Sequence, residues 1–477
     1  MPKNSKTFYV TAAIPYVNAK PHLGHVFEWL QADAIARYHS ALGEDVAFSS
    51  GADENSLKNV QAAEKAGKTT QAWLDEYSEI FKEAFKFFGI SLTSFRRGSD
   101  QKLHWPGVQE LWKLCDKNGD IYKKSYTGLY CVGCESFYTP DELVDGKCPE
   151  HFTVPEEVTE ENYFFKLSKY EKEIKKLIES DELRIVSDQF KNEMLGFINT
   201  GLQDFSISRS VTRGRGFGVP VPNDPTQVMY VWFDALTIYM TAIGWGFDQE
   251  QFEKYWPADL HVIGKGINRF HSVYWIGMLL SAKLSIPKSI SVHGYITADG
   301  QKMSKSLGNV IDPFEVVTQY GLEPIRYFLL KEIPAHSDGD FSHARFREVY
   351  EADLANGIGN LCSRVAKLSE KANLSGHKVE ISFNPQFTEL LKSYELDKSL
   401  QWLKQITIEA DQFLSEKQPW KQAGEEQAKT LDEAIDRILT IAYHLQPFMP
   451  ETSKKILTHF SQEKIAAIQP LFPRLAE

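Results

Sequence analysis

The chain has 477 residues, too many for one ordinary hydrophobic core, so two to four domains are expected. Its composition, 42% hydrophobic and 25% charged, is that of a globular protein. No apolar run approaches membrane-spanning length, and residues 1–6 lack the apolar stretch of a signal peptide. We therefore expect a cytoplasmic protein with no membrane contact. The net charge of −11 weakens the case for a nucleic-acid partner, although phosphate contacts need only local Lys and Arg.

The first part of the chain alternates predicted strands and helices. Residues 8–13 form a β-favouring run and residues 14–21 a loop, after which apolar residues recur at helical spacing from Leu23 onward. Further candidate strands span residues 46–50, 229–233, 260–263 and 290–292. This alternation predicts an α/β fold with a Rossmann-like, doubly wound parallel sheet covered on both faces.

Two later regions depart from the alternation. Residues 122–223 hold three of the five cysteines and read as an insertion into the α/β domain, whose sheet resumes near Val228. Beyond residue 342 the apolar spacing predicts amphipathic helices at 349–368, 396–414 and 431–445, hence a C-terminal helical bundle. The predicted segments are the first half of the α/β domain, the insertion, the second half, a connecting region and the helical domain, at residues 1–121, 122–223, 224–295, 296–345 and 346–477.

The stretch His22-Leu23-Gly24-His25 follows the first predicted strand and loop at the start of a helix. Two imidazoles three residues apart share one helix face, near a terminus whose backbone N–H groups favour anions. Because Gly24 has no side chain, a flat base or ribose can lie against the backbone. A helix with two surface histidines explains the tetrapeptide equally well when it is considered alone.

The stretch Lys302-Met303-Ser304-Lys305-Ser306 follows Asp299-Gly300, so a loop is expected. Its two ammonium groups suit a polyphosphate whose charge builds up in a transition state. A solvated loop would look the same in isolation.

Together, in this order on one α/β chain, the two stretches resemble the His-Ile-Gly-His and Lys-Met-Ser-Lys-Ser signatures of class I aminoacyl-tRNA synthetases. The resemblance implies that His22, Gly24 and His25 bind ATP. It also implies that Lys302 and Lys305 stabilise the pentacoordinate α-phosphate and the departing pyrophosphate, with Mg²⁺ as a charge partner.

Four potential metal ligands form two close pairs in the insertion. Cys131-x₂-Cys134 is followed, after thirteen residues, by Cys148-x₂-His151. Three thiolates and one imidazole in two such pairs are typical of a closed, structural tetrahedral Zn²⁺ site. A Cys-x-x-Cys redox pair is the rival interpretation, but it leaves Cys148 and His151 unexplained.

Several further segments are similar to one subgroup, the methionyl-tRNA synthetases. They include residues 11–18, 204–209, 230–239 and 470–474, together with Gly264-Lys265 ahead of His271. The resemblance implies that Asp53, after the second strand, pairs with the α-ammonium of L-methionine, and that Tyr16, Gly264 and Lys265 contact ATP. The remaining residues implied for the methionine pocket, beside Tyr16 and Asp53, are Ala13, Ile14, Trp232, Ala235, Leu236, Tyr239, Ile267 and His271. Aromatic rings suit a thioether, although core packing explains any one of them alone.

The chain departs from the family pattern at two places. Gly266 stands where Asp is common after the Gly-Lys pair, so a hydrogen bond to the ATP ribose is expected to be lost or replaced. Asn55-Ser56 stands where His-Gly is common.

In the helical region, Asn360 and Arg364 lie four residues apart on one predicted helix face, and Trp420 follows Pro419. A surface Arg and a core Trp explain this spacing too. The resemblance implies instead that these three residues read the CAU anticodon of tRNA(Met), since amide, guanidinium and indole groups suit splayed bases. It also implies that the zinc-bearing insertion guides the acceptor end. No oligonucleotide-binding domain follows the bundle, so a monomer is expected.

Two other functions are possible alternatives. A synthetase for Ile, Val or Leu would need a larger insertion for editing, and the cysteine enzyme places its zinc at the substrate. A catalytically inactive tRNA-binding relative would have no need for His22, His25, Lys302 and Lys305. The resemblance therefore favours methionine–tRNA ligation.

Overall fold

A computed structural model describes residues 6–133, 136–150, 152–303, 309–378 and 380–475. The chain divides into two compact units, one of residues 1–21 and 45–292, the other of residues 22–44 and 293–477. The division falls at other places than the five segments expected from the sequence, whose boundaries stay predictions. In the described part of the chain, no helix has the length and apolarity needed to cross a membrane.

The first unit contains a six-stranded sheet with the order β3-β2-β1-β12-β13-β7. Its strands are β1 (Thr7–Ala12), β2 (Asp45–Ala52), β3 (Ser94–Arg97), β7 (Arg184–Val186), β12 (Leu260–Gly264) and β13 (Ser289–His293). β1 pairs in parallel with both β2 and β12, β3 pairs in parallel with β2, and β7 with β13. Because the order steps outward from β1 in both directions, this is the Rossmann-like parallel sheet expected from the sequence.

Two features of this sheet differ from the prediction. The predicted strand at 229–233 is wrong: β11 (Asp224–Met229) ends there, and helix α7 (Val231–Thr241) begins two residues later. A short apolar run cannot be assigned to strand or helix by periodicity, and every residue of α7 is buried, so its sequence carries no polar face. In addition, β7 joins the main sheet although it lies within the region predicted as an insertion.

The predicted insertion contains antiparallel strands. One sheet has the order β5-β4-β6-β8 and another the order β10-β11-β9. Their bounds are β4 (Ile121–Cys131), β5 (Ser136–Tyr138), β6 (Glu156–Phe165), β8 (Phe205–Ser206), β9 (Ser208–Ser210) and β10 (Pro220–Val221). These strands lie in the region where the sequence shows no alternation of strands and helices.

Helices complete the first unit. They are α2 (Leu57–Lys65), α3 (Thr70–Phe87), α4 (Trp105–Lys117), α5 (Glu171–Glu179), α6 (Asp188–Asn199), α8 (Gln249–Tyr255) and α9 (Trp275–Ala282). Short turns are η1 (Pro140–Glu142), η2 (Leu167–Tyr170), η3 (Lys265–Ile267) and the π-helix η4 (Phe270–Tyr274). One core cluster joins α4, α7 and α9 to the strands, and it includes Cys115, which packs as an apolar residue.

The second unit begins with α1 (Leu23–Ala41) and continues after residue 293. A small sheet of order β15-β14-β16 is formed by Gln301–Lys302, Ile296–Ala298 and Gly339–Phe341. The helices that follow are α10 (Pro313–Tyr320), α11 (Leu322–Glu332), α12 (His343–Val349), η5 (Tyr350–Gly359), α13 (Asn360–Lys371), α14 (Pro385–Lys392), α15 (Leu396–Lys417), η6 (Pro419–Lys421), α16 (Gly424–Leu445) and α17 (Pro450–Phe460). The chain beyond residue 342 is thus helical, as expected.

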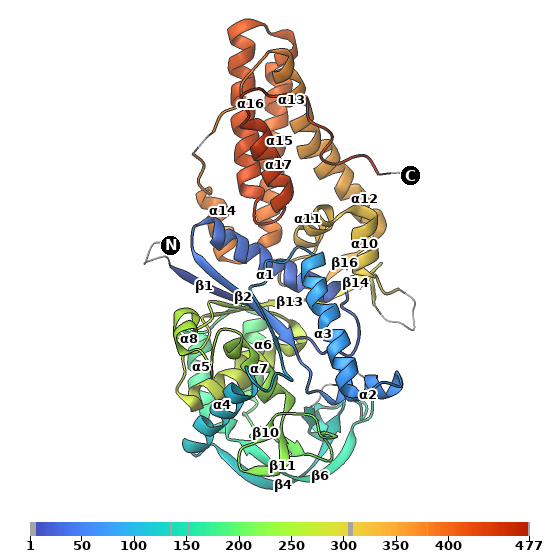
Figure 1. Cartoon of the computed structure of the whole chain (residues 1–477), viewed down its shortest axis with the longest axis vertical. Coiled ribbons are helices and arrows are strands. Elements are labelled where there is room, and N and C mark those ends of the chain that lie inside the picture. The colour runs from blue at the N-terminus through green and yellow to red at the C-terminus, as the bar shows by residue number, and fades with distance from the viewer. Residues whose placement is uncertain (1–5, 134–135, 151, 304–308, 379, 476–477) are drawn as a thin grey trace. The chain divides into compact units, whose positions relative to one another are not determined.

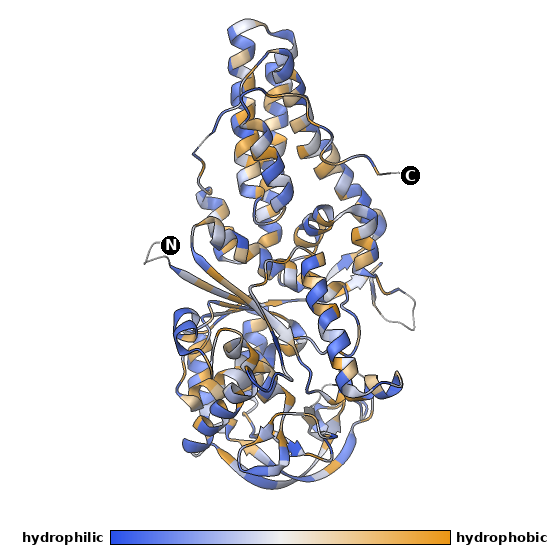
Figure 2. Cartoon of the chain, viewed as in Figure 1, coloured by the Kyte–Doolittle hydropathy of each residue, from blue (hydrophilic) through white to orange (hydrophobic). Residues whose placement is uncertain are grey.

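Four of these helices, α13, α15, α16 and α17, lie side by side as a bundle (Figure 1). Apolar and polar residues alternate around them (Figure 2), so each helix buries one stripe against its neighbours. The helix predicted at 349–368 is not one straight α-helix. It comprises the end of α12, the π-helix η5 and α13, with non-helical dihedral angles at Gly357.

Candidate active site

The first unit places several predicted site residues at the topological switch point of its sheet. β1 ends at Ala12 and the neighbouring parallel strand β12 ends at Gly264. Ala13 and Ile14 follow the first strand, and Lys265 follows the second. Ligands of doubly wound sheets bind at the carboxyl ends of the strands where the order reverses, so these residues occupy the expected ligand position.

Asp53 lies beside the loop that leaves β1. Its backbone N–H donates to the Pro15 carbonyl at 2.9 Å, and a backbone bridge joins it to Tyr16. The amide of Asn59 donates to the Asp53 carbonyl at 2.8 Å, so the backbone is anchored on both sides. The residue is only 3% exposed. A carboxylate is thus held almost out of water next to the switch point.

Helix α7 carries four of the predicted pocket residues, Trp232, Ala235, Leu236 and Tyr239, and all are buried. Trp232 stacks on Phe270 with ring centroids 4.0 Å apart and planes 3° from parallel. One cluster contains Ala13, Trp232, Leu236 and Tyr239, and Ile14, Tyr16 and Ile267 pack against it. The structure therefore brings the predicted apolar pocket residues together within one unit.

Hydrogen bonds fix the orientation and tautomer of His271. Its Nδ1 lies 3.0 Å from the Ile267 carbonyl, which can only accept, so Nδ1 carries the hydrogen. Nε2 then accepts from the Tyr239 hydroxyl at 2.8 Å. Burial lowers the pKa of His271 to about 4. The ring is therefore neutral at pH 7, and the π-helix η4 that bears it is a local distortion often found at functional sites.

The sequence did not predict a buried polar network that links helix α7 to the loop after β2. Asn55 Nδ2 donates to the Gly98 carbonyl at 2.9 Å and to Asp234 Oδ2 at 2.5 Å. His104 Nε2 lies 2.5 Å from the other oxygen of Asp234, and its Nδ1 lies 2.8 Å from the Thr241 hydroxyl. The network ties the loop of Asp53 to helix α7. The signal for it is a carboxylate inside an otherwise apolar helical run.

In the second unit, His22 and His25 cap the start of α1 with each other's side chains. The His22 N–H donates to His25 Nδ1 at 3.2 Å, and the His25 N–H donates to His22 Nδ1 at 3.4 Å. The rings stack with centroids 3.7 Å apart. This is the geometry of a capping box, with histidines in place of the usual Ser and Glu. Since each Nδ1 accepts a hydrogen bond, each Nε2 carries the hydrogen and can donate.

Both rings are neutral at pH 7. One side of His22 is exposed, yet the surrounding protein desolvates the ring and lowers its pKa to about 4, with a smaller contribution from His293. Desolvation lowers the pKa of His25 as well, helped by His22 and His293. His293 lies 3.1 Å from the Glu28 carboxylate. The pair therefore offers hydrogen-bond donors rather than permanent charges.

The lysine-rich stretch begins on a hairpin. β14 and β15 are joined by Asp299-Gly300, both with positive φ, as the tight two-residue turn requires. The Gly300 N–H and the Thr297 hydroxyl donate to Asp340 Oδ1 at 2.7 and 2.6 Å, which fixes this turn. Lys302 pairs with Thr297 through its backbone. Lys305 lies outside the described residues.

Only half of the predicted zinc ligand set is described. Cys131 and Cys148 are both buried, are not joined in a disulfide, and share a small cluster with Tyr138. Cys134 and His151 lie outside the described residues. Within the described ranges no group of three potential metal ligands is assembled, which leaves the predicted set untested.

The residues predicted to read the anticodon lie on the bundle. Asn360 and Arg364 occupy one helix, α13, as expected, and Asn360 is exposed. The Arg364 guanidinium lies 5.6 Å from the centre of the Trp420 ring and forms an ion pair with Asp411. Trp420 is 46% exposed on η6, so it is not a core residue. The Trp420 indole and the Asn360 amide are therefore exposed to solvent on this unit, and the Arg364 guanidinium beside Trp420 is half-buried.

The switch-point sheet and the histidine pair that starts α1 are the architecture of a class I synthetase, and a family comparison agrees. The family described as "tRNA synthetases class I (M)" matches residues 8–154 and 153–366. The chain belongs to this family, the methionyl-tRNA synthetases of class I.

Individual relatives are similar along nearly the whole chain. The "Methionine--tRNA ligase" of Thermotoga maritima is 40% identical over 96% of this chain and 76% of its own length. That of Brucella suis is 35% identical over 98% of both chains. A solved Mycobacterium tuberculosis methionyl-tRNA synthetase, in complex with methionyl-adenylate, has a TM-score of 0.91 and 34% identity. It covers 98% of this chain and 100% of its own.

Proposed function

We propose that this chain ligates methionine to tRNA(Met) in two steps. A methionine carboxylate oxygen attacks the ATP α-phosphorus, the bond to the bridging oxygen of the β-phosphate breaks, and pyrophosphate leaves. A ribose hydroxyl at the tRNA 3′ end then attacks the carbonyl carbon of methionyl-adenylate and releases AMP. The observation that carries this proposal is the near-complete match to methionine–tRNA ligases, together with the buried carboxylate of Asp53 and the buried aromatic cluster of Trp232 and Tyr239 in the same unit.

The first unit supplies the methionine pocket in this proposal. Asp53 pairs with the α-ammonium, because an ammonium group next to an almost fully buried carboxylate stabilises the negative charge of that carboxylate. Trp232 and Tyr239 contact the thioether, which gains from proximity to aromatic rings. Among the described residues the buried Trp232 Nε1–H meets no hydrogen-bond acceptor, so a polar ligand atom can complete it. Neutral His271 closes the pocket without adding a charge. The further residues assigned to it are Ala13, Ile14, Tyr16, Ala235, Leu236 and Ile267.

The residues predicted to bind ATP are each assigned a role toward its phosphates or its nucleoside. In the second unit, His22 and His25 donate from Nε2 to phosphate oxygens, and Gly24 leaves room for the nucleoside. Lys302 and Lys305 neutralise the charge that develops on the α-phosphate and pyrophosphate. In the first unit Tyr16, Gly264 and Lys265 contact the nucleotide from the switch point. Mg²⁺ would accompany ATP and supply charge neutralisation at the phosphates.

We assign anticodon recognition to Asn360, Arg364 and Trp420. The exposure of Asn360 and Trp420 and the planar groups of all three residues support stacking on, and hydrogen bonding to, unpaired bases. Neither the amide nor the indole needs positive net charge on the whole chain, so this role is compatible with a net charge of −11.

A structural Zn²⁺ held by Cys131, Cys134, Cys148 and His151 is proposed for the insertion. The fit rests on two of the four residues: the buried cysteines 131 and 148 share one cluster at the end of β4. A bound Zn²⁺ would link the two pairs of ligands, and so the two ends of the segment between residues 131 and 151, and would contribute to the folding of that segment. With four protein ligands, it would leave no open position for catalysis. We further propose that the chain acts as a cytoplasmic monomer.

Pyrophosphate exchange tests the proposed function. In the presence of ATP, labelled pyrophosphate and each of the twenty amino acids in turn, methionine alone should support exchange. The Lys305→Ala variant should lose most of this exchange while retaining methionine binding. Exchange with isoleucine but not methionine would refute the assignment, and full exchange by Lys305→Ala would refute the role of that lysine.

A further inference from the structure

The helix that leads into the proposed anticodon residues is distorted just before them. η5 (Tyr350–Gly359) contains π-helical turns and is interrupted by a kink at Gly357, whose φ of −84° and ψ of −111° lie outside the helical region. π-Helical turns are rare in α-helices and often coincide with functional sites. A Cβ at Gly359 would lie 2.7 Å from the Leu354 carbonyl oxygen, and one at Gly357 would lie 3.3 Å from that of Ala352. The distortion therefore depends on two glycines.

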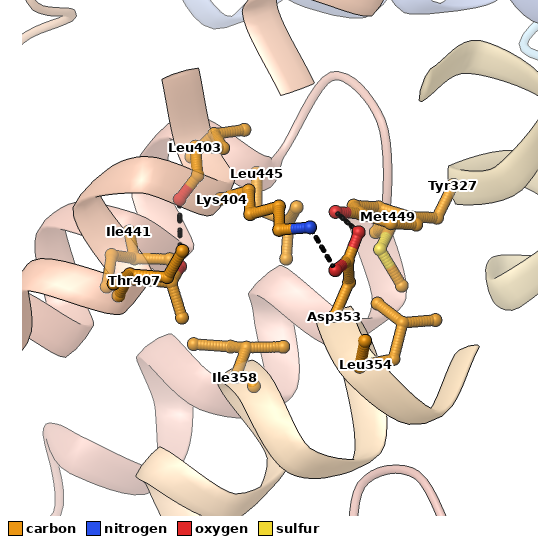
Figure 3. Close-up of a pocket in the computed structure, with 13 residues that line it drawn as sticks. Tyr327, Asp353, Leu354, Ile358, Leu403, Lys404, Thr407, Ile441, Leu445 and Met449 are labelled. Carbon is orange, nitrogen blue, oxygen red and sulfur yellow. Dashed lines mark hydrogen bonds and ion pairs between the residues drawn. The ribbon is translucent and has the colours of Figure 1, made fainter. Parts of the chain in front are cut away.

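A cavity of about 130 Å³ lies against this distorted segment (Figure 3). Its walls come from α11, η5, α15, α16 and the residue before α17, and most of the lining side chains are aliphatic. The wall residues labelled in Figure 3 include Leu354, Ile358, Leu403, Ile441, Leu445 and Met449. Side chains beside a void lose packing contacts on that side. Apolar packing at the cavity wall consequently contributes little to stabilising the conformation of η5.

Charged groups at one end of the cavity hold η5 instead. The Asp353 carboxylate accepts from the Tyr327 hydroxyl at 3.1 Å and pairs with Lys331 Nζ at 3.1 Å, both on α11. Lys404 Nζ on α15 lies 2.8 Å from its other oxygen (Figure 3). The Asp353 and Lys331 side chains are only 2% and 7% exposed. Because separating a buried ion pair is costly, the turn that bears Asp353 is fixed to two other helices.

The register of η5 determines where the next helix points its side chains. Asn360, the first residue of α13, comes directly after η5, and Arg364 follows one turn later. A π-helix contains more residues per turn than an α-helix. If η5 became α-helical, the register of the following residues would shift by one residue. Helix α13 would then turn by about 100° around its axis. Arg364 would then leave Trp420 and Asp411.

We propose that Asp353 and Gly357 are positioning residues for tRNA recognition, with the buried pairs of Asp353 holding the kink at Gly357 that aims Asn360 and Arg364. This inference rests on the proposed function, because it assumes that those two residues contact the anticodon. It assigns no contact with substrate to Asp353 or Gly357 themselves. It predicts that loosening the kink harms tRNA recognition and leaves methionine activation intact.

The test compares two Gly→Ala variants of the full chain. Gly357→Ala favours the α-helical form at the kink, whereas Gly196→Ala lies in α6, where an added Cβ meets nothing within 4 Å. We expect Gly357→Ala to raise the KM for tRNA(Met) by at least about tenfold, the loss of roughly one base contact. Methionine-dependent pyrophosphate exchange should match that of Gly196→Ala.

A second variant and a second readout guard against a merely structural effect. Asp353→Asn combined with Lys331→Met removes both buried charges at once and should give the same loss of tRNA affinity. In both variants the preference, in kcat/KM, for a CAU anticodon over a transcript with one anticodon base changed should fall. A simple loss of stability would lower kcat/KM for both transcripts by the same factor, so the ratio of the two kcat/KM values would not change.

The failures are distinguishable by direct binding of labelled tRNA(Met) without methionine or ATP. Equal tRNA affinity in wild-type and folded Gly357→Ala protein overturns this inference, as does a parallel loss of pyrophosphate exchange. Wild-type protein that binds tRNA but does not activate methionine overturns the proposed function instead.

Discussion

Replacing Asp53 by Asn should weaken methionine binding strongly, although the two side chains have nearly the same size. The amide keeps the volume, and the anchoring contacts of residue 53 are made by its backbone N–H and carbonyl groups. What is lost is the charge opposite the methionine ammonium. Because Asp53 is only 3% exposed, that ion pair is desolvated. Losing one partner of such a pair costs about 2–5 kcal/mol. This corresponds to a rise of roughly 30- to 4,000-fold in the KM for methionine.

The neighbouring carboxylate is the control. Glu54 is also buried, but its oxygens accept from the Ser78 hydroxyl, from Arg97 Nε at 2.8 Å and from the Ser99 N–H at 2.9 Å. Glu54→Gln should therefore reduce stability by about 1–3 kcal/mol and leave the methionine KM nearly unchanged. Pyrophosphate exchange gives both KM values, and thermal unfolding gives stability. A methionine KM for Asp53→Asn within threefold of wild type would refute this reasoning.

The pKa of His271 is about 4, below its ordinary 6.5, so an unfolded chain binds a proton that the folded chain excludes between these values. The free energy of unfolding should consequently fall by about 2 kcal/mol more in wild type than in His271→Gln when the pH drops from 7 to 5. Urea titrations at both pH values measure the free energy of unfolding. Equal losses in wild type and His271→Gln would contradict this prediction. Cys148→Ser should lower the zinc content, one ion per chain in wild type by metal analysis, to well below half; unchanged content would exclude this ligand. Trp420→Ala should raise the KM for tRNA(Met) by about 5- to 150-fold without changing pyrophosphate exchange, since one stacked base contributes about 1–3 kcal/mol. A KM equal to that of wild type would remove the stacking role.

The sequence predicted those parts of the fold that carry a regular period. β1, β2, β12 and β13 are apolar runs between turn residues, and the long helices α15 and α16 show clear apolar stripes. β3 and β7 escaped notice because one is polar and the other has three residues. The kink at Gly357 has a signal in retrospect: the apolar positions Val349 and Leu354 are five apart, one more than an α-helix prefers.

Site residues that belong to a short sequence motif could be predicted from the sequence. Site residues that are brought together only by the fold could not. The stacking of His22 on His25 follows from their spacing at a helix start. The roles of Asn55, His104 and Asp234 depend instead on partners more than a hundred residues apart along the chain, as the hydrogen bonds of Asp234 illustrate. A single sequence contains no local pattern for such contacts. Their discovery needed the strand order that brings α4, α7 and the loop after β2 together.

The most direct test of the central claim follows one oxygen atom. Methionine labelled with ¹⁸O in its carboxylate is incubated with ATP, tRNA(Met) and the protein, and the AMP released is analysed by mass spectrometry. If the carboxylate attacks the α-phosphorus, each AMP formed by charging carries one ¹⁸O atom from methionine. Unlabelled AMP, or ADP and phosphate in its place, would contradict the account.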